Sequence, residues 1–344
     1  MYDFNNKVIL SICIPTYNRA KYLSELLESI ICQVTKNIEQ KIEICISDNA
    51  STDNTTEVVR RYVDGCNLRI VYNRNTENLG ADRNFLKVVE IASGEYCWFL
   101  GSDDKMASDA LDVVLKAVKK YIGFDVFILH NGSYNVDFSK QVNIGNYGQP
   151  LFSKHKEDFV FQSTRQFLQK ASYILGFISI LMFKKSRWDE VERKQELIGT
   201  NYIHIYKILE IIKRKGRAVY LSPETVKWRS DNDSFLSDLK IYGRLKIDVV
   251  GYYEISKEVF GLNTKEQKDV LNLVLNTHFS TRVLLINKAR LINPKDQFRF
   301  LCLFFKYYWR LPCFWYKKLP ILLIPSSILL RGYKLFKFFK DYWR

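Results

Sequence analysis

Two adjacent acidic residues are the strongest chemical signal in the sequence. Asp103 and Asp104 come shortly after the apolar run Tyr96–Leu100. Adjacent carboxylates repel each other, and a divalent cation such as Mg²⁺ or Mn²⁺ removes that cost and acts as a Lewis acid on diphosphate oxygens. The alternative is a solvated turn in which Asp103 caps the helix that starts near Ala107. We favour the cation site, with Asp103 also among the catalytic residues, because the pair ends a predicted strand.

A third carboxylate ends another predicted strand. Asp48 closes the apolar run 42–46 and is followed by a polar segment that contains Asp53. A carboxylate in this place can accept a hydrogen bond from a pyrimidine ring N–H or from a ribose hydroxyl. The alternative is that Asp48 caps the next helix, but Asp53 fills that role more naturally. We therefore predict a binding role for Asp48.

These acids need elements that bring them together. The first 130 residues alternate strand-like runs with helical patterns of apolar residues at i, i+3, i+4 and i+7. We expect strands at 8–14, 42–46, 68–71, 96–100 and 125–129, and helices at 22–31, 79–91 and 107–118. Such an order predicts an α/β fold, with a mostly parallel sheet flanked by helices. The carboxyl ends of parallel strands share one edge, so Asp48, Asp103 and Asp104 should converge there.

The pattern changes along the rest of the chain. Residues 131–160 look irregular, 163–182 partly helical, 196–215 helical and 218–221 strand-like. From about Asp233 the pattern is helical throughout. We therefore predict two domains, an α/β domain over 1–232 and a helical region over 233–344.

Charge and aromatic residues are concentrated at the C-terminal end. The net charge is +15, and the segment 298–344 holds ten Lys and Arg against one acidic residue, Asp341. The same segment holds 16 of the 50 aromatic residues. Amphipathic helices that combine basic and aromatic faces lie in membrane interfaces, so we expect the region 296–344 to bind an anionic membrane surface. The alternatives are a core helix pair with solvated lysines, and a nucleic-acid-binding surface, which the interleaved Leu, Ile and Phe residues disfavour.

Other features narrow the class of protein. The seven cysteines show no C-x-x-C spacing, which is typical of reduced thiols in a cytosolic protein. We see no secretory signal and no run of 18 apolar residues. The expected location is the cytoplasmic face of the inner membrane, with peripheral attachment.

Four segments together resemble glycosyltransferase family 2, whose members have the GT-A fold. They are LSICIPTYNRAKYLSELLESI, EICISDNASTDNT, ENLGADRNF and GEYCWFLGSDD. They follow the family's order and spacing, cover residues 8–129 well and extend weakly to about 229. The short NLGADRNF and GSDD forms are similar to O-antigen transferases of the abequosyltransferase type. The resemblance implies a GT-A domain that binds a divalent cation and a nucleotide-sugar donor, such as CDP-abequose or a similar deoxysugar donor.

The resemblance also implies a role for each matching position. Asp103 and Asp104 match the end of the family's metal motif, although Gly101 stands where its first aspartate usually is. The residues that would contact the donor are Pro15, Thr16, Tyr17, Asp48, Asn78, Gly80, Arg83, Asn84, Asp103 and Arg229. Within this set, Arg83 would meet the diphosphate as a fork donor, and Arg229 would close over it.

The general base is less well marked. Inverting members place a Glu-Asp pair before a helix, but the corresponding stretch here, 199–204, contains no acid. His204 is the first candidate, because an imidazole of ordinary pKa suits a base; a His packed on a helix is an equal alternative. Asp189, Glu190 and Glu196 are the fallback candidates, and a retaining reaction would need no such base.

The predicted function is therefore sugar transfer from a nucleotide diphosphate to a polyprenyl-diphosphate-linked oligosaccharide in cell-surface polysaccharide synthesis. The missing acids leave a second hypothesis, a catalytically silent scaffold that keeps the fold. A basic nucleic-acid binder is the third.

Overall fold

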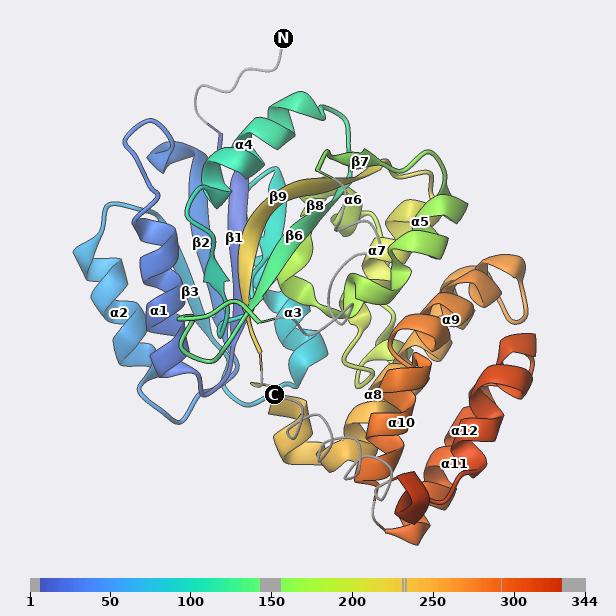
Figure 1. Ribbon diagram of the computed structural model, residues 1–344. Helices are drawn as coiled ribbons and strands as arrows, with labels where there is room; N and C mark the ends of the chain where they lie inside the picture. Colours follow the sequence, from blue (N-terminus) through green and yellow to red (C-terminus); the bar gives the residue numbers. More distant parts are fainter. Residues whose placement is uncertain (1–6, 143–155, 231, 233, 292, 330–344) are drawn as a thin grey trace. The chain divides into compact units, whose positions relative to one another are not determined.

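The computed structural model describes residues 7–142, 156–230, 232, 234–291 and 293–329 (Figure 1). The chain forms two compact units, Met1–Asn232 and Asp233–Arg344.

A nine-stranded mixed sheet organises the described part of the first unit. Its strands run in the order β3-β2-β1-β4-β8-β6-β9-β5, and β7 pairs with β9. They are β1 (Leu10–Thr16), β2 (Ile42–Asp48), β3 (Ile70–Arg74), β4 (Tyr96–Phe99), β5 (Lys105–Met106), β6 (Val126–Tyr134), β7 (Phe159–Val160), β8 (Leu181–Lys184) and β9 (Ala218–Arg229).

The central strands are parallel and buried, as the sequence predicted. β1 pairs in parallel with both β2 and β4, and every residue of these three strands is buried. Helices cover both faces, which explains why the strands read as continuous apolar runs rather than alternating ones. β8 lies antiparallel between β4 and β6, and β5 and β7 lie antiparallel to β9.

Helices α1 to α4 of the first unit have amphipathic sequences with their apolar faces buried, whereas α7 is buried on nearly all sides. Helix α1 buries Leu23, Leu26, Leu27 and Ile30, the spacing that the sequence indicated. Helix α3 packs on β1 and β2 and contacts α7. The helices are α1 (Ala20–Ile31), α2 (Thr55–Gly65), α3 (Ala81–Glu90), α4 (Ala110–Lys120), α5 (Thr164–Lys170), α6 (Lys185–Asp189) and α7 (Ile203–Lys213), with 3₁₀ turns η1 (Glu39–Lys41), η2 (Ser172–Gly176), η3 (Ile178–Ile180) and η4 (Gln195–Leu197).

The second unit is helical. Its elements are α8 (Ser234–Phe260), α9 (Lys265–Thr277), α10 (Thr281–Arg290), α11 (Pro294–Tyr308), the π-helical turn η5 (Phe314–Lys318) and α12 (Leu319–Leu323). Aromatic residues build much of its core, where Phe279, Phe300 and Phe304 are almost completely buried. Within the described residues, every helix is too short or too polar to cross a bilayer.

Candidate active site

Three strand ends meet at one edge of the sheet. Thr16 of β1 is in register with Asp48 of β2, and the Leu100 N–H after β4 donates to the Cys13 carbonyl of β1. The polar residues that follow these strands therefore lie at the same edge, as predicted. Because β1 lies between β2 and β4, Asp48 is about two strand spacings, or about 10 Å, from the end of β4. Asp48 and the acid pair are thus placed to contact different parts of one elongated ligand.

The Asp104 carboxylate is buried and held from two sides. Its Oδ1 accepts the Arg229 backbone N–H at 3.1 Å, and its Oδ2 accepts the Ser179 hydroxyl at 2.5 Å. The Ser179 Oγ in turn accepts the Gly101 N–H at 2.8 Å. Burial, followed by the charge of Asp103, raises the pKa of Asp104 well above its usual range. A cation at this carboxylate would offset that cost.

The neighbouring Asp103 is partly exposed, with 27% of its side chain accessible. Its Oδ2 accepts the Asn232 amide at 2.8 Å and lies 3.7 Å from the Arg19 guanidinium. Burial raises the pKa of Asp103 above its usual value, against the lowering effect of the Arg19 charge. A cation, or the phosphate oxygens that come with one, can therefore reach this carboxylate.

Packing explains the glycine at position 101. A Cβ atom there would lie 3.1 Å from both Asp104 Oδ2 and Ser179 Oγ, and 3.3 Å from Asp103 Oδ1. A side chain at this position would need these oxygens to shift by a few tenths of an ångström. The Ser179 hydroxyl occupies the space beside Asp104, and sequence reasoning missed this residue because η3 is 75 residues away along the chain.

Asp48 is completely buried, and its carboxylate is already bonded within the protein. Oδ1 accepts the Ser51 N–H at 2.9 Å, Oδ2 accepts the Tyr72 hydroxyl at 2.8 Å, and the Arg74 guanidinium lies 3.7 Å away. These contacts order the loop after β2. The predicted contact between Asp48 and a nucleotide base would use the remaining lone pairs.

The segment after β3 contains one exposed arginine and several amide side chains that are bonded within the protein. Arg83 is exposed and has no hydrogen-bond or ion-pair partner among the described residues. Asn78 accepts the Asn49 amide at 2.7 Å, and Gly80 starts α3 with φ 79°, a conformation that favours glycine. Asn84 is buried and bonds Ser47 with both ends of its amide, so its predicted contact with the donor stays a prediction.

The end of β1 provides the remaining predicted donor contacts. Pro15 and Thr16 are buried in β1, while Tyr17 is 43% exposed just beyond it. Thr16 Oγ1 has no hydrogen-bond partner among the described residues. An unpaired hydroxyl next to an exposed aromatic ring is compatible with a pocket for a nucleotide base.

Arg229 does not lie free above the site. Its side chain is 2% exposed, and its guanidinium donates to the Asp103 carbonyl, the Val136 carbonyl and the Glu25 carboxylate. These bonds use three of the five guanidinium N–H groups of a buried side chain, so this structure does not place Arg229 over the site, and its contact with the donor diphosphate stays a prediction.

The structure also argues against His204 as the general base. His204 is 1% exposed, its Nε2 hydrogen-bonds the Leu175 carbonyl at 3.0 Å, and the Phe85 ring lies edge-on at 5.1 Å. Burial lowers the pKa of the imidazole to about 3. A base this weak and this enclosed is unsuited to take a proton from an acceptor hydroxyl.

Two fallback bases lie at the wrong edge. Lys184 pairs with Tyr96, the first residue of β4, so Asp189 and Glu190 lie near the beginning of that strand. The acid pair follows its end, on the opposite edge of the sheet. Glu196, exposed in η4, is the remaining predicted carboxylate.

Asp82 has a role that sequence reasoning missed. Its carboxylate accepts three backbone N–H groups at 2.7 to 3.0 Å, those of Gly199 and Asn201 in the loop before α7 and that of Ile203, the first residue of the helix. The side chain therefore caps a helix that is far away along the chain. It ties the loop before α7 to the first turn of α3, directly beside Arg83.

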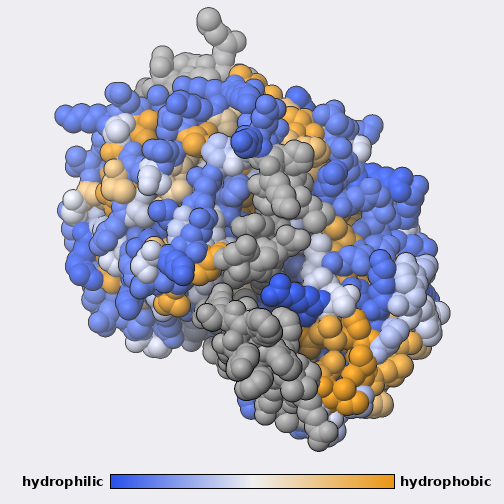
Figure 2. Space-filling model, in the orientation of Figure 1, coloured by the Kyte–Doolittle hydropathy of each residue, from blue (hydrophilic) through white to orange (hydrophobic). Residues whose placement is uncertain are grey.

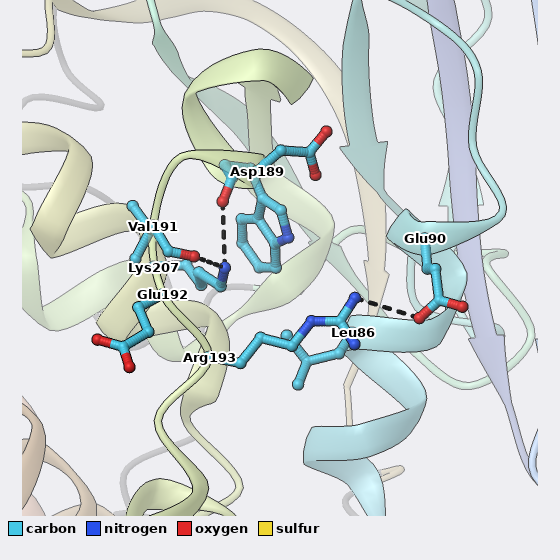
Figure 3. Close-up of a pocket in the computed structure, with 8 residues that line it drawn as sticks. Leu86, Glu90, Asp189, Val191, Glu192, Arg193 and Lys207 are labelled. Atoms are coloured by element: carbon cyan, nitrogen blue, oxygen red, sulfur yellow. Dashed lines mark hydrogen bonds and ion pairs between the residues drawn. The ribbon is translucent and has the colours of Figure 1, made fainter.

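Two cavities lie away from this edge. One of about 200 Å³ is lined by Glu90, Trp188, Arg193 and Lys207, where Arg193 pairs with Glu90 and Lys207 points to backbone carbonyls (Figure 3). A second, of about 520 Å³, is bordered by Lys7, Ser93 and Lys184. Both are at the side where β4 begins, so neither belongs to the acid pair.

Comparison with known proteins agrees with the fold. Residues 11–185 match the model of glycosyl transferase family 2. The chain is 36% identical to the abequosyltransferase RfbV of Salmonella typhimurium over 78% of this chain and 80% of that protein. It is 28% identical to a GalNAc(5)-diNAcBac-PP-undecaprenol beta-1,3-glucosyltransferase of Campylobacter jejuni, over 61% of this chain and 64% of that protein.

Solved structures show the same architecture. TarS 1–349 of S. aureus matches with a TM-score of 0.64 and 18% identity, covering 89% of this chain and 81% of that chain. The mannosyltransferase PcManGT of Pyrobaculum calidifontis, in complex with GDP-Man and Mn²⁺, matches with a TM-score of 0.55 and 16% identity, covering 95% of this chain and 88% of that chain. The chain has the GT-A fold and belongs to glycosyltransferase family 2.

Proposed function

We propose that this glycosyltransferase moves a sugar from a nucleoside diphosphate to a hydroxyl of a polyprenyl-diphosphate-linked oligosaccharide, in the synthesis of an O-antigen or a similar surface polysaccharide. The observation that carries the proposal is the shared edge, where the Asp103–Asp104 loop after β4 meets the polar ends of β1 and β2. Two relatives point to the pathway, one named for abequose transfer and one for an undecaprenol-linked acceptor.

The acid pair fits a cation that is shared with the donor. The described residues contain no cluster of three His, Cys, Asp or Glu side chains that would bind a metal alone. Mg²⁺ and Mn²⁺ are commonly held by one or two carboxylates together with substrate phosphates. Asp103 and Asp104 would supply the carboxylates, and the bound cation would stabilise charge on the leaving diphosphate. PcManGT, a structural neighbour, was solved with both GDP-Man and Mn²⁺.

The rest of the donor would lie across the ends of β1 and β2. Pro15, Thr16, Tyr17 and Asp48 would surround the base, about two strand spacings from the acids. Arg83, exposed at the start of α3, would donate its fork to diphosphate oxygens near Asn78 and Gly80. We propose a deoxysugar such as abequose, carried by CDP, as the first donor to test, because RfbV matches over most of both chains.

The C-terminal unit would hold the enzyme at the membrane where such acceptors lie. Over the described residues from 294 onward, its exposed apolar residues are Phe298, Phe305, Trp309, Trp315, Tyr316, Leu323 and Ile328. Exposed basic residues stand among them, including Lys306, Arg310 and Lys317. Figure 2 shows hydrophobic surface on this unit, in the region where Figure 1 draws α11 and α12. Aromatic side chains beside Lys and Arg suit the interface of an anionic bilayer. The predicted second amphipathic helix, 328–344, falls mostly outside the described residues.

The experiment is a transfer assay with labelled nucleotide sugars and membrane extracts that contain lipid-linked acceptors. Asp104→Asn keeps the size of the side chain but removes a cation ligand, and we expect it to lower transfer by about 100-fold or more. Asp189→Asn makes the same chemical change at the opposite edge and should leave transfer within about twofold. Equal activity of wild type and Asp104→Asn, with EDTA present, would show that transfer does not require a cation at Asp104.

A further inference from the structure

One guanidinium joins four distant segments of the chain around the acid pair. Arg229 Nε donates to the Asp103 carbonyl at 2.7 Å, and one terminal nitrogen donates to the Val136 carbonyl. The other terminal nitrogen donates to Glu25 Oε2 at 2.9 Å. The Arg229 backbone N–H holds Asp104 at 3.1 Å. One residue at the end of β9 therefore bonds both members of the acid pair, the segment after β6 and helix α1.

Aromatic rings enclose the same group. The Arg229 guanidinium carbon lies 4.4 Å from the ring centre of Tyr22 and 4.3 Å from that of Phe138. Phe138 has φ 59°, a left-handed backbone conformation that is strained for a bulky residue. Such a conformation persists only where surrounding contacts hold it, and the stacking on Arg229 is one of them.

Glu25 completes the assembly from α1. Its Oε2 accepts Arg229 and also lies 3.0 Å from Lys105 Nζ, and Lys105 directly follows the acid pair. The loop 101–105 is thus bonded on one side through Arg229 and on the other through Lys105, with Glu25 common to both.

We propose that Glu25 and Arg229 are positioning residues, which set the spacing and direction of the Asp103 and Asp104 carboxylates for a divalent cation. Arg229 bonds the Asp103 carbonyl and the Asp104 carboxylate, and Glu25 holds Arg229 and the Lys105 side chain, without touching the cation or the donor. That the spacing of the two carboxylates serves a cation rests on the proposed function, whereas the ordering of the loop 101–105 does not. Residues behind metal ligands commonly affect metal affinity in this way.

The test uses Glu25→Gln, which keeps the size of the side chain, and Glu95→Gln as a matched control. Glu95 pairs with Lys184 at 3.6 Å with 21% of its side chain exposed, against 28% for Glu25, but at the opposite edge. The first measurement is hydrogen exchange of residues 100–106 in the metal-free full-length protein. We expect exchange about fivefold or more faster in Glu25→Gln and unchanged in Glu95→Gln.

The second measurement is Mn²⁺ binding, followed by the electron paramagnetic resonance signal of free Mn²⁺ in the presence of UDP, GDP or CDP. We expect Glu25→Gln and Arg229→Lys to weaken binding about tenfold, and Glu25→Asp to recover part of the loss. If Arg229→Lys does not fold, the Glu25 variants decide.

Three outcomes are distinguishable. Unchanged exchange in Glu25→Gln overturns the proposal. Faster exchange with wild-type Mn²⁺ affinity overturns it too, because the loop order would not serve the cation. In the third outcome, exchange is faster in Glu25→Gln but wild type binds no Mn²⁺ with any of the nucleotides. That result supports the ordering role of Glu25 and contradicts the cation in the proposed function instead.

Discussion

At the residue scale, the buried His204 should make the stability of the protein depend on pH. This dependence distinguishes a structural role of His204 from a catalytic one. Burial lowers the pKa of the imidazole to about 3, whereas an unfolded chain has a value near 6.5. The folded state therefore binds fewer protons than the unfolded state between these values. Stability should fall as the pH drops below about 6.5, with a slope of about 1.4 kcal/mol per pH unit from this group.

We expect His204→Gln to flatten that slope in urea unfolding followed between about pH 6 and pH 4. Transfer by the folded variant should keep its dependence on pH. A variant that keeps the wild-type unfolding slope and loses transfer by about 100-fold would restore His204 as the base.

Single residues also show what local sequence reasoning can locate. Asp104 stands out as a candidate because two adjacent acids after a buried strand repel each other unless a cation or another positive group lies beside them. The burial of His204 and Arg229 was not predictable, because their types and spacing are the same whether the side chain faces a ligand or the interior. The positions of Ser179 and Glu25 against the acid pair depend on chain segments far away in sequence, so a local pattern contains no sign of them.

At the element scale, the N-terminus of α7 depends on Asp82. Its carboxylate accepts the N–H of Ile203, which the helix itself cannot satisfy, and those of Gly199 and Asn201 in the loop before it. Asp82→Ala would leave them unpaired, and we expect it to lower the free energy of unfolding by about 2 kcal/mol or more in urea titrations.

The control is Asp112→Ala in the first turn of α4, where the side chain is 62% exposed and pairs with Lys116. It should change stability by less than about 0.5 kcal/mol. Similar losses in the two variants would show that Asp82 is an ordinary surface acid.

The order of elements was predictable in the first half of the unit and less so in the second. Apolar runs and helical spacing located β1, β2, β4 and α1 to within a few residues. The helix predicted over 196–215 begins only at Ile203, because η4 and the loop bonded to Asp82 precede it. β8 was missed, since a four-residue apolar strand inside 163–182 has no periodicity of its own, and only pairing with β4 and β6 makes it a strand.

At the scale of the whole molecule, the net charge of +15 and the exposed aromatic residues of the C-terminal unit should act together. The double variant Trp309→Ser, Trp315→Ser removes two large exposed side chains, and we expect it to lower partitioning onto vesicles about tenfold. Ile122→Ser removes an apolar residue that is 55% exposed on the first unit, and it should leave partitioning unchanged.

Vesicle composition and salt supply the second half of that test. Co-sedimentation with phosphatidylglycerol vesicles should weaken at high salt, whereas phosphatidylcholine vesicles should bind little at any salt concentration. Equal binding of the double variant and Ile122→Ser would contradict the membrane role. The composition of the sequence indicated this region. Which of its aromatic residues are buried and which are exposed depends on how the helices pack, and composition does not determine that.

The central claim is that Asp103 and Asp104 hold a nucleoside diphosphate through a divalent cation. The most direct measurement is thermal unfolding of wild type and Asp104→Asn with UDP, GDP, CDP or dTDP, each with and without Mn²⁺. A bound ligand raises Tm by mass action. We predict that at least one nucleotide raises the Tm of wild type only when Mn²⁺ is present, and that Asp104→Asn abolishes the rise. A metal-dependent rise that survives in Asp104→Asn, or no rise with any nucleotide, would contradict the account.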